Sequence, residues 1–170
     1  PNLVAFDLYD ANMARIRLKF DEPVDASSVD FGKIIFQSEN GDVAYTLTGG
    51  VAKYYDEGVN ALEEPKMTLD LYPKVLDING IKTKNGLGVS KASSNIKLLA
   101  GMVADMSGRK IADSAAKNAL QYISDRDLAV LTDYTLDLNN GEIRFTFTDS
   151  IDISTLDPTQ LTIMGVKDYE

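Results

Sequence analysis

The stretch IRLKFDEPVDASSVDFGKIIF at residues 16–36 decides the fold, because the chain contains it twice. Residues 143–163 read IRFTFTDSIDISTLDPTQLTI and keep the same apolar and acidic positions. Self-similarity at one long period is typical of tandem repeats, in which each unit folds around its own core. We therefore expect a complete domain at residues 1–128 and the first strands of a second, incomplete domain at residues 129–170.

The second copy is too short to fold in the same way as the first. Three short strands cannot bury an apolar face without further strands packed against them. Something outside residues 129–170 is therefore expected to complete this copy. The predicted partners are other copies of the chain or adjacent repeats of the same chain.

Alternating apolar and charged side chains predict an antiparallel strand at residues 14–20. Ile16, Leu18 and Phe20 would face the core, and the basic residues between them would face water. Several such short strands, separated by turn signals and with no long amphipathic helix, predict an all-β fold, specifically an Ig-like antiparallel β-sandwich in tandem.

Three further segments complete the expected architecture. A short helical turn is predicted near residues 74–82, with Val75, Ile78 and Ile81 or Leu76 toward the core. Residues 49–65 are predicted to be an exposed connection. Residues 120–123 are predicted to be the last strand of the first domain, in preference to a helix at residues 114–122.

The composition excludes several classes of function. Acidic residues outnumber basic residues by 26 to 17, for a net charge of -9, whereas nucleic acids and anionic membranes bind basic faces. Cysteine and histidine are absent, which removes thiol nucleophiles, thiolate metal sites and the usual general base. No apolar run reaches the length of about 18 residues that spans a bilayer. We expect no nucleic-acid partner and no membrane insertion.

Two segments of the sequence resemble those of a known protein family. FDEPVDASSVDFGKIIF, followed by GMVADMSGRKI at residues 101–111, resembles the bacterial Ig-like domains of S-layer and surface proteins. The longer pattern is similar to tandem repeats of very long secreted or cell-surface proteins of bacteria, algae and other protists. Arg109 stands where that family usually has asparagine, and Pro23 is replaced by Ser150 in the second copy. The resemblance implies an Ig-like sandwich that serves as a spacer, an adhesive stalk or part of a surface layer or filament, and an extracellular or cell-surface location.

Acidic side chains in the loops make up a candidate calcium site. Hard oxygen ligands gathered from loops at a domain junction would suit Ca²⁺ and would stiffen the array. The alternative is that aspartates in turns cap the backbone and keep the surface hydrated. The candidate ligands are Asp21, Glu22, Asp25, Asp105, Asp125 and Asp127.

Four other residues are candidates for interaction. Tyr54 and Tyr55 could stack on a sugar of a surface glycan or contact a neighbouring chain, because exposed aromatic faces serve both purposes. Arg17 and Arg144 recur at the same place in the two copies. They could pair with a carboxylate of another molecule, or form cross-strand pairs at the surface.

No catalytic residue is assigned, because adjacent carboxylates such as Asp21 and Glu22 point apart on a strand or loop. The sequence predicts a chain that is not an enzyme: a non-enzymatic extracellular structural repeat, a building block of a surface filament, layer or stalk. The alternatives are a ligand- or carbohydrate-binding adhesin module, rigidified by Ca²⁺, and an accessory domain of an enzyme. No cofactor other than Ca²⁺ is implied.

Overall fold

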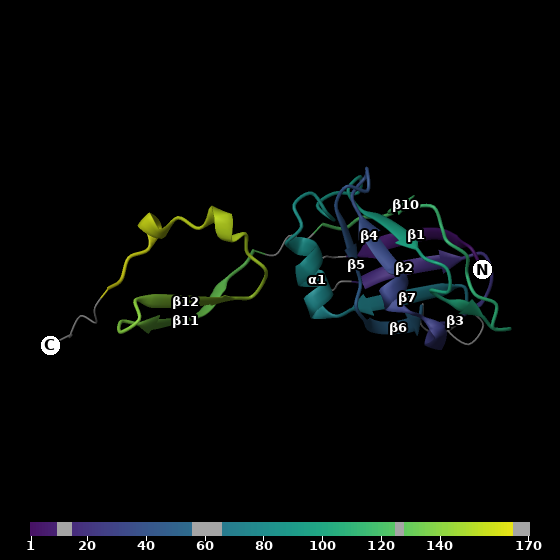
Figure 1. Cartoon of the computed structure of the whole chain (residues 1–170), viewed down its shortest axis with the longest axis horizontal. Coiled ribbons are helices and arrows are strands. Elements are labelled where there is room, and N and C mark those ends of the chain that lie inside the picture. Colours follow the sequence, from purple (N-terminus) through teal and green to yellow (C-terminus); the bar gives the residue numbers. More distant parts are fainter. Residues whose placement is uncertain (10–14, 56–65, 125–127, 165–170) are drawn as a thin grey trace. The chain divides into compact units, whose positions relative to one another are not determined.

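The computed structural model describes residues 1–9, 15–55, 66–124 and 128–164 (Figure 1). The chain divides into two compact units, Pro1–Asp127 (unit 1) and Leu128–Glu170 (unit 2). Each unit has its own sheets.

The first sheet of unit 1 has the antiparallel order β1-β2-β7-β6. Its strands are β1 (Leu3–Tyr9), β2 (Arg15–Phe20), β6 (Gly50–Tyr54) and β7 (Thr68–Pro73). Along β2 the apolar side chains Ile16, Leu18 and Phe20 are buried, as their alternation predicts. Because β2 has a neighbour on each side, it lies in the interior of the sheet.

The second sheet of unit 1 has the order β10-β8-β4-β5. Its strands are β4 (Ile34–Gln37), β5 (Ala44–Thr46), β8 (Asn95–Leu98) and β10 (Lys117–Asn118). Residues 120–123, predicted to be the last strand of the first domain, are not assigned as a strand, although their backbone runs parallel to β1 with a bridge between Tyr122 and Leu8 and hydrogen bonds to Phe6 and Leu8. β10 forms where it does because Lys117 and Asn118 pair with the free edge of β8.

A further pair of short strands, β3 (Val24–Asp25) and β9 (Ala104–Asp105), joins the loop after β2 to the late hairpin. Two 3₁₀ turns, η1 (Ala26–Ser28) and η2 (Phe31–Lys33), follow β3. Asp25 and Asp30 cap these turns, because their carboxylates accept the backbone N–H groups of Ser27 and Gly32.

Side chains from both four-stranded sheets meet in one hydrophobic core. Full burial of a large aliphatic or aromatic side chain contributes about 1.5 to 3 kcal/mol to folding. The regular secondary structure of the described residues is mostly β-strand, with one α-helix, so the prediction of an all-β class holds at this level. The largest fully buried side chains are Phe6, Ile16, Leu18, Phe20, Ile34, Phe36, Leu47, Leu69, Leu71, Leu87, Ile96 and Leu98.

The helix α1 (Val75–Lys82) occupies the predicted place but presents a different face to the core. Val75 was predicted to point inward, with Leu76 as the alternative to Ile81, yet the exposed fractions of Val75 and Leu76 are 75% and 70%. The buried residue of the helix is Asp77, which binds backbone and side-chain donors of the loop after β5. Ile81 packs against the core as predicted.

In the described part of the chain, no helix is long and apolar enough to cross a membrane.

The prediction of an exposed connection at residues 49–65 is wrong for its first part, which forms β6. Val51 and Ala52 pair with Tyr72 and Leu71 of β7. β6 is an edge strand whose side chains are largely exposed, so its sequence lacks the apolar alternation that marks a half-buried strand. Residues 56–65 lie outside the described residues.

Unit 2 repeats the first part of unit 1 at the level of backbone geometry. Its hairpin consists of β11 (Leu131–Asp137) and β12 (Glu142–Phe147), followed by the 3₁₀ turns η3 (Ile153–Thr155) and η4 (Pro158–Gln160). The register shift at Leu3/Ala5 in β1 recurs at Leu131/Asp133 in β11. Asp152 and Asp157 cap η3 and η4 as Asp25 and Asp30 cap η1 and η2.

Candidate functional site

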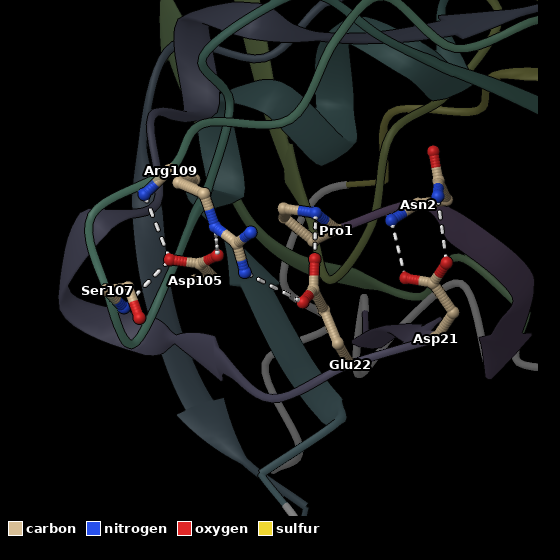
Figure 2. A network of polar contacts seen from close by, with 7 residues as sticks. All are labelled: Pro1, Asn2, Asp21, Glu22, Asp105, Ser107 and Arg109. Carbon is tan, nitrogen blue, oxygen red and sulfur yellow. Dashed lines mark hydrogen bonds and ion pairs between the residues drawn. The ribbon is translucent and has the colours of Figure 1, made fainter.

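A polar network at the start of unit 1 contains three of the predicted calcium ligands (Figure 2). Asp105 is buried, and its Oδ1 accepts the backbone N–H groups of Ser107 at 2.8 Å and Arg109 at 2.9 Å. Its Oδ2 accepts Arg109 Nε at 2.6 Å. The residue that departs from the family pattern, Arg109, therefore neutralises the charge of Asp105.

The other two carboxylates of this network are also held by donors. Asp21 accepts the backbone and side-chain nitrogens of Asn2 at 2.7 and 2.8 Å. Glu22 contacts the N-terminal nitrogen of Pro1 and lies 3.5 Å from Arg109 Nη2. The three acids thus bind nitrogen donors of the protein itself, and Asp105 and Glu22 share the guanidinium of Arg109.

The remaining predicted ligands do not join this network through any contact in the described structure. Asp25 caps η1 through Ser27, and Asp125 and Asp127 lie outside the described residues. Among the residues that the structure describes, no three acidic side chains gather in a metal-binding arrangement. The calcium site stays a prediction.

The Asp105 network predicts that unit 1 loses stability in acid. The Arg109 backbone N–H is the largest cause that holds the pKa of Asp105 below its ordinary value; the Arg109 guanidinium and the Ser107 N–H act in the same direction, and burial opposes them. Because the folded-state pKa of Asp105 is lowered, its ionised carboxylate stabilises the folded state. This stabilisation is fully present above the ordinary aspartate pKa of about 3.9 and is lost as the pH falls through the folded-state pKa. We expect the urea midpoint of unit 1 to fall between about pH 5 and pH 2.

The Asp105→Asn variant tests this expectation, because its urea midpoint should depend less on pH than that of the parent chain. Asp42→Asn, at an exposed position, is the matched control and should leave the pH profile unchanged. Parallel profiles for the parent and Asp105→Asn would contradict the prediction.

The predicted interaction residues of unit 1 pack against one another and against neighbouring strands. Arg17 Cζ lies 3.4 Å from the centre of the Tyr55 ring. Arg17 also forms a forked contact with Asp70 of β7, with Nε to Oδ1 at 2.7 Å and Nη2 to Oδ2 at 2.9 Å. Tyr54 Oη accepts the backbone N–H of Ala26 at 3.2 Å. In the single chain, Arg17 and Tyr55 therefore bind within unit 1.

Asp70 is a residue that sequence reasoning missed. It is buried in the middle of a leucine-rich strand, opposite Arg17 in the β2–β7 ladder. A charged residue inside the alternating run KMTLDLY was the available signal, because a buried acid requires a cationic or hydrogen-bonding partner.

Arg144, the counterpart of Arg17, has a different environment in unit 2. Its side chain is 75% exposed, and Nη2 lies 3.1 Å from Glu142 Oε1. β12 pairs with β11 on one edge, and in the described residues the other edge pairs with no strand. The position that Asp70 fills beside Arg17 has no counterpart in the described part of unit 2.

The apolar face of the β11–β12 hairpin is exposed where the matching face of unit 1 is buried. Ile143 is 38% exposed and Tyr134 is 63% exposed, whereas their counterparts Ile16 and Phe6 are each 1% exposed. We call this surface the uncovered face; it consists of Leu131, Tyr134, Leu136, Ile143, Phe145, Leu161 and Ile163.

After β12 the chain turns back along the β11–β12 hairpin through η3 and η4 (Figure 1), and residues 161–164 follow beside the hairpin. Together they line an open apolar hollow of about 430 Å³. Leu161 and Ile163 correspond to Ile34 and Phe36 of β4, which pair with Leu98 and Ile96 of β8. Residues 161–164 form no strand, because no counterpart of β8 is present in the described part of unit 2.

Comparison with known proteins gives one structural likeness. No protein-family model and no curated protein matches the sequence. A solved structure described as "Crystal Structure of a Thermostable Esterase" is similar at 11% identity and a TM-score of 0.43. The match covers 82% of this chain and 39% of that one, so the chain spans well under half of that protein's length.

This comparison contradicts two predictions made from the sequence. The first prediction was a non-enzymatic structural repeat of a filament, layer or stalk, with an adhesin module as its alternative. The second was that the chain is not an enzyme. The similar structure, in contrast, is described as an esterase. At this TM-score and identity, the likeness assigns no catalytic residue to the chain.

Proposed function

We propose that this chain is a strand-accepting β module, in which unit 2 binds an extended polypeptide strand along the free edge of β12. The observation that supports the proposal is the exposure of the uncovered face, whose counterparts in unit 1 are buried. A contiguous exposed apolar patch marks an interaction site, and an unpaired strand edge binds an extended peptide through main-chain hydrogen bonds.

Unit 1 supplies the template for the partner. β7 pairs antiparallel with β2, so that Leu69 lies opposite Leu18 and Leu71 lies opposite Ile16. The matching positions of β12 are Phe145 and Ile143. The partner is therefore a strand with leucine-like side chains at alternate positions, running antiparallel to β12. The same proposal includes an Ig-like sandwich arrangement for unit 1 and for the completed unit 2.

A peptide with the sequence of β7 tests the proposal. The peptide KMTLDLYPK (residues 66–74), added to the intact chain, should slow hydrogen exchange at the β12 backbone amides by roughly tenfold or more, because ladder formation protects amides. The measurement is residue-resolved hydrogen exchange. A peptide in which serine replaces Leu69 and Leu71 is the matched control, with the same length and charge.

A variant of the chain provides the second control. Ile143→Asp places a charge in the uncovered face and should abolish the protection, while exchange in unit 1 stays unchanged. Equal protection by the serine peptide would contradict the proposal. Self-association of the chain through β12, detected by analytical ultracentrifugation, would identify a second copy as the occupant and would also overturn it.

A further inference from the structure

We infer that Arg144 selects the partner strand by binding a carboxylate that lies opposite it, in the register in which Asp70 lies opposite Arg17. This inference rests on the proposed strand binding at β12 and adds the charge and the register of the strand that binds there. The partner is then an apolar–acid–apolar strand, in which an aspartate or glutamate lies between two leucine-like residues.

The geometry of unit 1 shows how such an acid is recognised. Arg17 and Asp70 lie directly opposite each other in the ladder, and the guanidinium binds both carboxylate oxygens. The exposed fractions of their side chains are 13% and 7%, so the contact is largely shielded from water. A two-pronged contact of this kind is both stronger and more specific in direction than a single hydrogen bond.

The described part of unit 2 contains Arg144, the counterpart of Arg17, but no counterpart of Asp70. Arg144 lies at the same register position of β12 as Arg17 in β2: Arg144 pairs with Thr135 of β11, as Arg17 pairs with Asp7 of β1. Its flanking residues Ile143 and Phe145 belong to the uncovered face. A strand that places leucines against these two apolar side chains therefore places its intervening residue beside Arg144.

The charged neighbours of the arginine differ between the two hairpins at more than one place: Asp7, opposite Arg17, is replaced by Thr135, and the neighbour that lies against the guanidinium in unit 2 is Glu142. It occupies the place of Arg15, whose Nη1 lies 3.9 Å from Asp70 Oδ2 in unit 1. In unit 2 the carboxylate of Glu142 instead lies against Arg144. An incoming acid must displace Glu142 from the guanidinium, so Glu142 competes with the partner for the same donor.

The arginine also fixes the register of the bound strand. A slip of one residue turns every side chain of a strand to the opposite face. A slip of two residues keeps the face but moves the acid by about 7 Å, beyond hydrogen-bonding reach of Arg144. Apolar contacts alone would tolerate the second slip, because leucines would still meet the uncovered face. The carboxylate contact excludes both slips.

Peptide affinity for the intact chain tests the inference. The probe is fluorescein-labelled KMTLDLYPK, measured by fluorescence anisotropy, beside the same peptide with Asp70→Asn. We expect the asparagine peptide to bind about tenfold to a hundredfold more weakly, because charged hydrogen bonds are lost while shape is kept. In the Arg144→Gln chain the two peptides should differ by less than about threefold. Because Arg144 is 75% exposed, this substitution should leave the hairpin fold unchanged.

Two further variants separate recognition from general electrostatic attraction. Glu142→Gln removes the competing carboxylate and should tighten binding of the parent peptide by about twofold to fivefold. Arg144→Asp should lose the parent peptide and should bind a peptide with Asp70→Arg in its place. Rescue by the exchanged charges would not follow from a purely apolar contact.

The outcomes distinguish the inference from the proposed function. Equal binding of the aspartate and asparagine peptides, with protection of the β12 amides intact, overturns the role of Arg144 and leaves strand binding standing. Failure of every peptide to bind overturns both.

Discussion

Replacing Asp77 by alanine should lower the free energy of unfolding of unit 1 by about 3 to 4 kcal/mol and its Tm by roughly 10 to 15 °C. The carboxylate is buried and accepts the Thr48 backbone N–H at 2.9 Å, the Gly49 N–H at 3.3 Å and the Thr48 hydroxyl at 2.8 Å. Alanine would leave these donors without an acceptor. Urea and thermal unfolding of the intact chain, followed by circular dichroism, provide the measurement.

The Tyr45 hydroxyl adds a fourth donor, 3.2 Å from Asp77 Oδ1. Burial raises the pKa of the Tyr45 phenol, and the hydrogen bond to Asp77 acts in the same direction. Tyr45→Phe removes only this donor and should cost about 1 kcal/mol. Asp42→Ala, at an exposed aspartate, should be neutral within about 0.5 kcal/mol. Equal stability of Asp77→Ala and Asp42→Ala would show that α1 does not depend on this contact.

Replacing Asp70 by alanine should lower the unfolding free energy of unit 1 by about 3 kcal/mol. The change removes both acceptors of the forked contact with Arg17 while the guanidinium stays largely buried between the sheet and Tyr55. Loss of the two charged hydrogen bonds from a largely buried guanidinium is the main cost. Chemical denaturation of the intact chain gives the value.

The repeat supplies the matched control for this second prediction. Arg144→Ala removes the corresponding arginine from unit 2, where its ion pair is exposed, and should change unfolding by less than about 1 kcal/mol. Arg17→Met combined with Asp70→Leu replaces the pair by apolar side chains and should be less destabilising than Asp70→Ala. A double variant as unstable as the single variant would show that the Arg17–Asp70 contact itself, rather than a buried guanidinium that has lost its Asp70 carboxylate, sets the cost.

The features of the fold that could be predicted are those that depend on local pattern. The alternation in β2 places Ile16, Leu18 and Phe20 in the core, and the turn chemistry of Asp25 and Asp152 gives the same cap in both copies. The inward face of α1 could not be predicted in this way. The apolar character of Val75 and Leu76 favours placing them in the core. The backbone N–H groups of Thr48 and Gly49 need an acceptor, however, and they bring Asp77 inward instead.

The candidate sites show the same division between local and long-range information. The recurrence of Arg17 and Arg144 is visible in the sequence, but the identity of the partner of Arg17 is not, because Asp70 is distant along the chain. The acids grouped as calcium ligands were chosen by loop position. In the structure Asp21 and Glu22 bind Asn2 and Pro1, which are distant along the chain, whereas Asp105 binds Ser107 and Arg109 of its own hairpin, as aspartates in turns commonly do.

The shared geometry of the two hairpins also bears on the order of folding. In unit 2 the hairpin keeps its register shift, and η3 and η4 keep their aspartate caps, although no counterparts of β7, β8 and β9 are present among the described residues. These features are therefore specified by contacts close in sequence, which form quickly because little chain entropy is lost in closing short loops. In unit 1 we expect the β1–β2 hairpin and its capped turns to be in place in the folding transition state, with β7 and β8 joining afterwards.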